Sequence, residues 1–275
     1  LLQSNRGETF RLFLITTADD AALEGLHEIG CRYGCTIVLL GTDGRAIEGL
    51  PVAGHISVAS YLRLLMGELL PKEVDRILYL DSDIVLNGPV DELWRMDLGG
   101  NIVAAAIDEV VDVHDKLGLP PGASYFNAGV LLVDLKKWRE TGIGRRAIDV
   151  VRNEPHRITW WDQCALNAVL QSRWLRLDRR WNLQTHALGR FTGSRVIVDE
   201  AGLTRAKDAA IVHFTTPLKP WLYTAEHPLK QLYWRYLKKT PWKGYRPPDR
   251  YAHTILCRIL VRYCPILLPH YLRLR

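Results

Sequence analysis

The chain has 275 residues, of which 48% are hydrophobic and 24% are charged, and its formal net charge at pH 7 is +6. This composition is typical of a soluble globular protein with a sizeable core. No apolar run approaches the roughly 20 residues that cross a bilayer, and no signal peptide is visible, so the sequence shows no transmembrane helix.

Short apolar runs alternate with helical patterns in the first half of the chain. Strands are expected at 10–15, 35–40, 76–80, 101–107 and 129–133. Apolar residues at helical spacing predict helices over 21–33 and 58–70. Nearly continuous apolar strands between helices are typical of a parallel or mixed sheet that is covered on both faces. The first half therefore predicts an α/β fold.

The second half is less regular and becomes strongly basic. Helices are expected over 135–151 and 162–170, and a short strand over 211–214. Eleven Lys and Arg residues follow position 225, against only Glu226 and Asp249. Such a basic segment suits an anionic partner, namely a membrane surface, a nucleic acid or a glycolipid. The alternative is a solvated charged face that binds no partner. The stretch 255–275 either lies on a membrane surface or packs as a helix of the domain.

The cysteines give no sign of a metal site. Cys31 and Cys35 have no matching pair, and the five cysteines share no repeated spacing. We expect reduced thiols in a cytoplasmic protein that is peripheral on the inner face of the membrane. The cysteines are Cys31, Cys35, Cys164, Cys257 and Cys264.

Two acidic residues, Asp81 and Asp83, follow the apolar run 76–80, where open α/β sheets bind their ligands. On an extended backbone residues i and i+2 point to the same side, so the two carboxylates would repel one another without a cation between them. Mg²⁺ and Mn²⁺ prefer oxygen ligands and can also bind phosphate oxygens. The pattern predicts a divalent-cation site at Asp81-Ser82-Asp83, with a solvated turn as the alternative.

The stretch 76–94 (RILYLDSDIVLNGPVDELW) resembles the core of the family 8 glycosyltransferases, which include bacterial lipopolysaccharide galactosyl- and glucosyltransferases. Four further segments resemble this family in the same order: 55–64 (HISVASYLRL), 125–138 (YFNAGVLLVDLKKW), 161–167 (WDQCALN) and 213–221 (HFTTPLKPW). The resemblance covers about residues 8–225. It implies a GT-A nucleotide-diphospho-sugar transferase fold, with a mixed, mostly parallel sheet flanked by helices.

The resemblance also implies an activity and its ligands. Such an enzyme transfers a hexose, galactose or glucose, from a UDP-sugar to a glycan acceptor such as lipopolysaccharide, with retention and with Mn²⁺ or Mg²⁺. Asp81, Asp83 and His213 match the metal ligands of the family. The donor-binding positions match Arg63, Asp81, Ser82, Asp83, Asn127 and Lys219.

The catalytic positions of the family match Asp108, Asp162 and Gln163. Asp108 and Asn127 correspond to residues around the transferred sugar, and Asn127 is expected in a turn before Gly129. A glutamine is a poor nucleophile, and no carboxylate suits that role. We therefore expect front-face substitution, in which Gln163 stabilises the reacting carbon and Asp162 binds sugar hydroxyls.

The sequence departs from the family pattern at three places. The first strand of the family, whose acidic turn binds the nucleoside, is not matched, so we expect an N-terminally truncated domain over 1–240 and a basic tail over 241–275. Cys164 stands where many members have Asp. Thr216 stands where the family has a glycine that lets the backbone approach a phosphate.

Two functions other than sugar transfer are also considered for this sequence. A non-catalytic module of the same fold that binds sugar nucleotides or glycans would explain Thr216 and the unmatched strand. A nucleic-acid-binding protein would explain the basic tail, but no recognisable nucleic-acid motif accompanies those charges, and we expect no nucleic acid among the partners. The expected partners are the UDP-sugar, a glycan or glycolipid acceptor, and an anionic membrane surface.

Overall fold

The computed structural model describes residues 1–16, 24–52, 58–109, 114–120, 122–171, 173–192, 195–217 and 219–263. The chain forms two compact units. The first comprises Leu1–Leu183 with Asp208–His213, and the second comprises Gln184–Lys207 with Phe214–Arg275. The division expected at residue 240 stays a prediction.

The first unit contains most of the strands. These are β1 (Arg11–Thr16), β2 (Thr36–Gly41), β3 (Arg76–Leu80), β4 (Ile84–Leu86), β5 (Val103–Ile107), β6 (Phe126–Asp134), β7 (Trp174–Leu177) and β11 (Ile211–His213). Of the two-residue strand β8 (Leu183–Gln184), Leu183 belongs to the first unit and Gln184 to the second. Its α-helices are α1 (Glu24–Tyr33), α2 (Met66–Leu69), α3 (Asp91–Arg95), α4 (His114–Leu117), α5 (Leu135–Glu140), α6 (Ile143–Asn153) and α7 (Trp161–Leu170). Its 3-10 helices are η1 (Leu2–Ser4), η3 (Arg45–Ile47), η4 (Val58–Leu65), η5 (Pro155–Arg157) and η6 (Arg179–Trp181).

The main sheet of the first unit has the strand order β3-β6-β5-β7. The β6 strand runs antiparallel to both of its neighbours, β3 and β5, whereas β5 and β7 are parallel. A separate parallel pair joins β1 to β2, and β11 pairs antiparallel with β4. The mixed α/β architecture expected from the sequence is therefore confirmed. The main sheet has two antiparallel strand pairs and one parallel pair, so it is less parallel than the sequence predicts.

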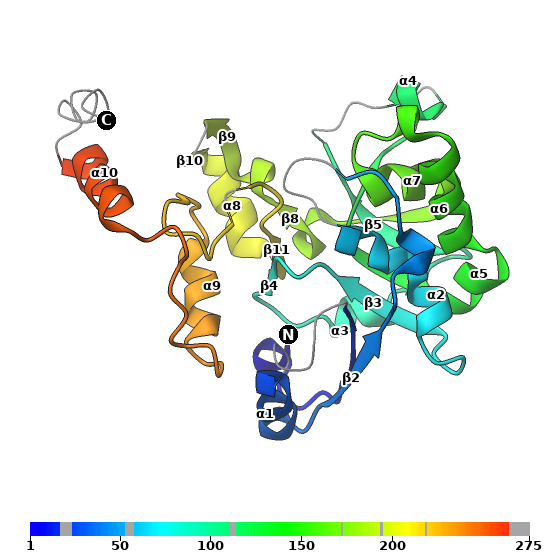
Figure 1. The fold of residues 1–275 in the computed structure, drawn as a ribbon, viewed down its shortest axis with the longest axis horizontal. Helices are drawn as coiled ribbons and strands as arrows, with labels where there is room; N and C mark the ends of the chain where they lie inside the picture. The colour runs from blue at the N-terminus through cyan, green and yellow to red at the C-terminus, as the bar shows by residue number, and fades with distance from the viewer. Residues whose placement is uncertain are drawn as a thin grey trace. The chain divides into compact units, whose positions relative to one another are not determined.

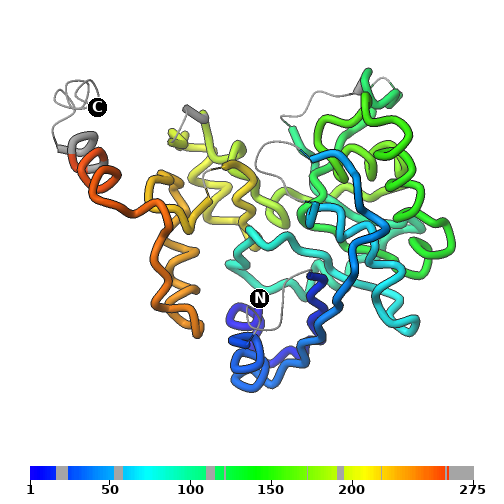
Figure 2. Tube along the Cα trace, viewed as in Figure 1, coloured from blue at the N-terminus to red at the C-terminus, as the bar shows by residue number. Residues whose placement is uncertain are grey.

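Alternating residues of the main sheet bury two separate cores. On β5, Val103 and Ala105 belong to one core and Ala104 and Ala106 to the other. The first core is covered by η4, α2, α5, α6 and α7, and η4 packs against α6 and α7 although they lie far apart in sequence (Figures 1 and 2). Burial on both faces explains why β5 and β6 read as continuous apolar runs.

The ladder between β5 and β6 is interrupted in the middle. Ala105 pairs with Leu131 and Ile107 with Phe126, so the single residue Ala106 stands opposite residues 127–130. Within that β6 segment the Ala128 amide and carbonyl bond to side chains, to Oε1 of Gln163 and to the Arg63 guanidinium. Such irregularities are common beside functional sites, where they redirect side chains.

The second unit is built from short elements. They are η7 (Thr185–Leu188), the antiparallel strands β9 (Gly189–Thr192) and β10 (Arg195–Val198), α8 (Glu200–Asp208), α9 (Lys230–Leu237) and α10 (Ala252–Tyr263). The Lys230 ammonium donates to the carbonyls of Leu222, Tyr223 and Ala225. The indole of Trp234 donates to the carbonyl of Pro220. Helix α9 thus fixes the backbone that follows Lys219.

Two predicted helices differ from the observed ones. The helix expected over 135–151 is divided into α5 and α6, because Gly142 adopts the left-handed conformation with φ 61°. Most of the helix expected over 58–70 is the 3-10 helix η4, followed by one α-helical turn. The strand expected at 129–133 extends over Phe126–Asp134, so Asn127 lies in β6 and not in a turn.

Two further expectations concern thiols and membranes. Cys31, Cys35, Cys164 and Cys257 are free thiols, and Cys264 lies outside the described residues. Within the described ranges, no helix has both the length and the apolar character that crossing a membrane requires. The last part of the stretch 255–275, beyond Tyr263, also lies outside the described residues.

Candidate metal and donor site

Asp81, Asp83 and His213 converge beside the end of β3. Their ligand atoms all lie within 4.8 Å of one another. Nε2 of His213 is 3.2 Å from Oδ1 of Asp83 and 3.7 Å from Oδ2 of Asp81. Because His213 pairs with Ile84 across β11 and β4, the imidazole is brought beside two acids that are far away in sequence. The residues expected to bind metal therefore meet in one place.

The two carboxylates converge through a turn. Ser82 and Asp83 form a turn between β3 and β4, and Ser82 is exposed within it. An extended backbone would also direct both acids to one side. The turn produces the same convergence, because both carboxylates reach His213.

Gly129 keeps the space between these ligands open. A Cβ at this position would lie 2.1 Å from Cε1 of His213 and 2.9 Å from Oδ2 of Asp81. The Gly129 carbonyl also accepts a hydrogen bond of 2.9 Å from the Asp81 amide. Only glycine allows the β6 backbone to approach the ligand atoms this closely.

Arg63 is buried and links Asp81 to Asp162. Its Nη2 lies 2.8 Å from Oδ1 of Asp81, and its Nε lies 2.8 Å from Oδ2 of Asp162. It also donates to the Ala128 carbonyl. Burial alone would lower the pKa of Arg63, but the carboxylates of Asp162 and Asp81 raise it above its ordinary value. The guanidinium therefore stays charged.

The charges of the site fit a divalent cation. Asp81, Asp83 and Asp162 contribute three negative charges and Arg63 one positive charge, so these four side chains together carry two negative charges. Two carboxylates and an imidazole are a suitable ligand set for Mn²⁺ or Mg²⁺. The residues present therefore fit the predicted metal.

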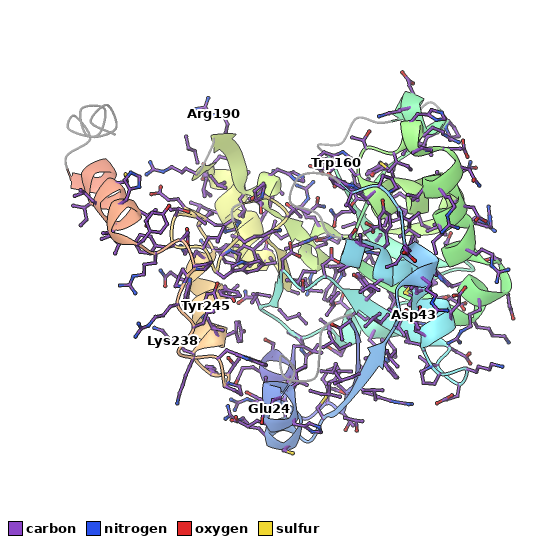
Figure 3. All side chains as sticks on the ribbon, in the orientation of Figure 1. Glu24, Asp43, Trp160, Arg190, Lys238 and Tyr245 are labelled. Atoms are coloured by element: carbon purple, nitrogen blue, oxygen red, sulfur yellow. The ribbon has the colours of Figure 1, made fainter. Side chains whose placement is uncertain are left out.

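Asp162 lies in the first turn of α7, beside a strained segment of backbone. Trp160, labelled in Figure 3, precedes the helix. Trp161 has φ 41°, a left-handed conformation that is unfavourable for a bulky residue and typical of functional sites. Burial raises the pKa of Asp162 to about 6, with Arg63 opposing the rise and Asp81 adding to it.

Asp108, Asn127 and Gln163 form one hydrogen-bonded group. The side-chain amides of Asn127 and Gln163 each donate to Oδ2 of Asp108 over 3.2 Å. Oε1 of Gln163 accepts from the Ala128 amide at 3.0 Å, within the interrupted part of the ladder. Three predicted sugar-site residues, one directly after β5, one in β6 and one in α7, are thus brought together.

Lys219 and Thr216 belong to the second unit. The Lys219 ammonium donates to the Phe214 carbonyl at 2.8 Å. The buried Thr216 hydroxyl oxygen has no hydrogen-bond partner among the described residues. That hydroxyl is therefore available to a ligand oxygen.

The sequence did not single out Asn182, Tyr79 or Gly129. Oδ1 of Asn182 lies 3.0 Å from Nδ1 of His213, and its amide donates to Oδ1 of Asn127 at 2.9 Å. The Tyr79 hydroxyl donates to Oδ1 of Asp81 at 2.8 Å. Tyr79 could have been found by the i, i+2 rule on strand 76–80, whereas nothing in the sequence signals Asn182.

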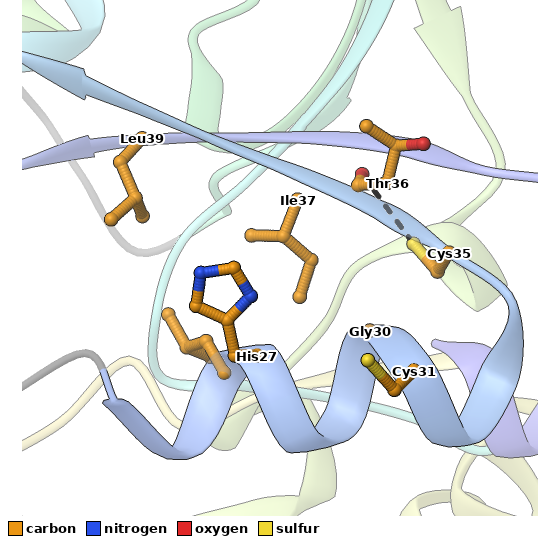
Figure 4. Close-up of a pocket in the computed structure, with 8 residues that line it drawn as sticks. His27, Gly30, Cys31, Cys35, Thr36, Ile37 and Leu39 are labelled. Carbon is orange, nitrogen blue, oxygen red and sulfur yellow. Dashed lines mark hydrogen bonds between the residues drawn. The ribbon is translucent and has the colours of Figure 1, made fainter.

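An open pocket of about 250 Å³ lies between α1 and β2, and no predicted site residue lines it (Figure 4). Its walls are mainly apolar, and the Cys35 thiol donates to the backbone carbonyls of Phe10 and Thr36. Burial raises the pKa of that thiol. The pocket therefore lacks a converging set of polar groups.

The sequence matches the family model described as Glycosyl transferase family 8 over residues 1–225. General stress protein A of Bacillus subtilis is 29% identical over 224 residues, which cover 79% of this chain and 78% of that protein. The lipopolysaccharide 1,2-glucosyltransferase of Escherichia coli K12 is 30% identical over 281 residues, which cover 98% of this chain and 80% of that protein.

Solved structures are also similar. The galactosyltransferase LgtC, in complex with donor and acceptor sugar analogues, matches with a TM-score of 0.68 and 22% identity over 86% of this chain and 99% of that chain. The glycosyltransferase GlyE of Streptococcus pneumoniae TIGR4 matches with a TM-score of 0.61 and 21% identity over 88% of this chain and 57% of that chain. These likenesses confirm the predicted glycosyltransferase fold.

Proposed function

Because the chain belongs to glycosyl transferase family 8, we propose that it is a metal-dependent, retaining hexosyltransferase. It moves galactose or glucose from a UDP-sugar to a glycan acceptor. The observation that carries the proposal is the convergence of Asp81, Asp83 and His213 within 4.8 Å. Lipopolysaccharide is the acceptor class we propose, because a relative named as a lipopolysaccharide glucosyltransferase covers 98% of this chain.

The Asp81, Asp83 and His213 side chains would hold Mn²⁺ or Mg²⁺. When bound, the cation neutralises charge on the leaving diphosphate. Lys219 adds a compact positive charge for the same diphosphate, a role that rests on the resemblance of the segment 213–221. The exposed Ser82 lies between the two acids and is proposed to face the donor phosphates.

Arg63, Asp108 and Asn127 are proposed to surround the donor sugar. Arg63 is oriented by Asp81 and Asp162, and Asn127 by Asp108. These contacts hold each side chain in one orientation before substrate arrives. Because these polar groups are already ordered, less of the binding free energy is lost to ordering them when the donor binds.

Retention is assigned to front-face substitution. Gln163 is held at both ends of its amide, by Asp108 and by the Ala128 amide, so it is fixed as a neutral dipole. It stabilises positive charge at the reacting carbon, while the leaving phosphate accepts the proton of the acceptor hydroxyl. Asp162 binds sugar hydroxyls and shares Arg63 with Asp81.

A panel of UDP-sugars with Mn²⁺ tests this function. UDP release is the readout, and the anomeric configuration of the product is determined by NMR. We expect release with UDP-galactose or UDP-glucose, a product with the anomeric configuration of the donor, and loss of release in Asp83→Asn. No release with any UDP-sugar from folded protein would instead favour a non-catalytic binding module, for which Thr216 is the supporting observation.

We also propose that the enzyme works in the cytoplasm, at the inner face of the membrane. On α10 the side chains of Leu256 and Ile259 are exposed and three residues apart, so they share one face of the helix. Trp242 and Tyr245 are exposed in the preceding loop, between basic residues. Apolar and aromatic side chains among basic ones suit an anionic lipid surface.

Vesicle sedimentation tests the membrane proposal. The protein should bind vesicles that contain anionic lipid more strongly than neutral ones, and binding should weaken as salt rises. Leu256→Asp with Ile259→Asp should release it, whereas Leu203→Asp, at an exposed leucine of α8, should not. Equal binding to neutral and anionic vesicles would contradict an electrostatic contribution.

A further inference from the structure

Asp81 uses its two carboxylate oxygens differently. Its Oδ1 accepts from the Tyr79 hydroxyl at 2.8 Å and lies 2.8 Å from Nη2 of Arg63. Its Oδ2 is the oxygen that faces Nε2 of His213, at 3.7 Å. One oxygen is therefore engaged by protein donors, and the other is directed toward the candidate metal position.

The Tyr79 hydroxyl is held in place by rigid structure. Tyr79 lies in β3 and pairs with Leu131 of β6, and its ring packs against the core beneath the helices. The Arg63 guanidinium lies 4.8 Å from the centre of that ring. The backbone amide of Asp81 is also fixed, because it donates to Gly129. The hydroxyl therefore has little freedom to follow a rotating carboxylate.

We propose that Tyr79 is a positioning residue that makes Asp81 a one-oxygen ligand of the bound cation. The proposal deepens the proposed function and rests on its metal site. Arg63 alone cannot supply the same constraint, because its guanidinium is shared among Asp81, Asp162 and the Ala128 carbonyl. The terminal torsion of an aspartate is broad, so an unrestrained carboxylate rotates readily.

The constraint has a consequence for metal selectivity. Mn²⁺ and Mg²⁺ favour compact six-coordinate sites, whereas Ca²⁺ accepts more oxygens and often binds carboxylates through both of them. Holding Oδ1 away from the cation keeps the oxygen count low. Loss of the Tyr79 hydroxyl should therefore weaken Mn²⁺ binding and weaken Ca²⁺ binding less, or strengthen it.

The test compares Tyr79→Phe with Tyr61→Phe in the full chain. Tyr61 is fully buried and Tyr79 is partly buried, but each hydroxyl donates one short hydrogen bond, that of Tyr61 to the Pro51 carbonyl at 2.7 Å, so its removal is a comparable loss of one hydrogen-bonded hydroxyl. Mn²⁺ binding is measured without donor by electron paramagnetic resonance, and Ca²⁺ binding by competition. Because partners of metal ligands typically contribute about 10–100-fold to affinity, Tyr79→Phe should raise the Mn²⁺ Kd by about that factor.

The control variant should keep the wild-type Mn²⁺ Kd. Unchanged Mn²⁺ binding and an unchanged Ca²⁺ to Mn²⁺ ratio in Tyr79→Phe would overturn the inference while leaving the metal site intact. Absence of Mn²⁺ binding in the wild type would overturn the metal site and the inference together. If Tyr79→Phe does not fold, a crystal structure of the wild type with Mn²⁺ decides: Oδ2 alone on the metal supports the inference, and both oxygens overturn it.

Discussion

Oδ1 of Asn182 lies 3.0 Å from Nδ1 of His213, on the side of the ring opposite the two carboxylates. The Asn182 amide donates to Asn127, so its oxygen is the atom left for the imidazole. The ring must then carry its proton on Nδ1 and present the lone pair of Nε2 to a cation. Asn182 thus selects the tautomer that a metal ligand requires.

Removal of this amide should weaken metal binding. Asn182→Ala is expected to raise the Mn²⁺ Kd by about 10–100-fold, because the imidazole loses the partner that fixes its tautomer. Nitrogen-15 NMR of labelled histidine in the wild type should show His213 protonated at Nδ1. Asn101→Ala, which removes an amide that donates to the Leu98 carbonyl, is the control and should bind Mn²⁺ normally. Absence of a proton on Nδ1 would refute the assigned role.

A methyl group at Gly129 should block the site. In Gly129→Ala the Cβ would fall 2.1 Å from the His213 ring, so the imidazole must move away from the acids. We expect loss of Mn²⁺ binding and a decrease of about 1–3 kcal/mol in the free energy of unfolding, as for other overpacked positions. Gly244→Ala has no atom within 4 Å of its Cβ and serves as the control. Wild-type Mn²⁺ affinity in Gly129→Ala would contradict the geometry.

Arg139 should be a large contributor to the stability of the first unit. Its guanidinium donates to the carbonyls of Gly67, Leu70, Pro71, Lys72 and Val74, which ties α2 and the segment after it to α5. Arg139→Met leaves these carbonyls without their donor and should cost about 3 kcal/mol or more, measured by denaturant unfolding. Arg145→Met, at an exposed position of α6, should cost less than about 0.5 kcal/mol.

His227 should make the protein less stable in acid. Its Nδ1 accepts from the Leu229 amide at 3.1 Å, and burial lowers its pKa from 6.5 to about 4. The unfolded chain therefore takes up this proton first, so stability falls as the pH drops from about 6.5 to about 4. The full loss is about 3 kcal/mol. His227→Gln should remove this contribution, seen as the difference in unfolding free energy between the variant and the wild type across that pH range. A constant difference would show that His227 does not titrate.

The site residues that could be predicted from sequence pattern alone are those that lie close together along the chain. Asp81 and Asp83 stand together after an apolar strand, so chain order alone placed them at a strand end. His213 and the Asp108–Asn127–Gln163 group came from family resemblance, because no local pattern joins residues that far apart. Asn182 was missed for the same reason, since it reaches His213 and Asn127 across 31 and 55 residues.

Strands could be predicted from the sequence where burial determines the pattern of apolar residues. Both-face burial makes β5 and β6 recognisable as strands. The interruption opposite Ala106 could not be predicted, because it follows from tertiary bonds of the Ala128 amide and carbonyl to Gln163 and Arg63. The break at Gly142 was visible as a glycine, but apolar periodicity on both sides concealed it.

The central claim is that Asp81, Asp83 and His213 hold the cation that sugar transfer requires. Its most direct test is a Mn²⁺ titration of metal-stripped protein with UDP-galactose or UDP-glucose and a glycan acceptor, with UDP release as the readout. We expect no release without metal, saturable recovery with Mn²⁺ in the wild type, and little recovery in Asp83→Asn. Full activity of the stripped protein, or wild-type recovery in Asp83→Asn, would contradict it.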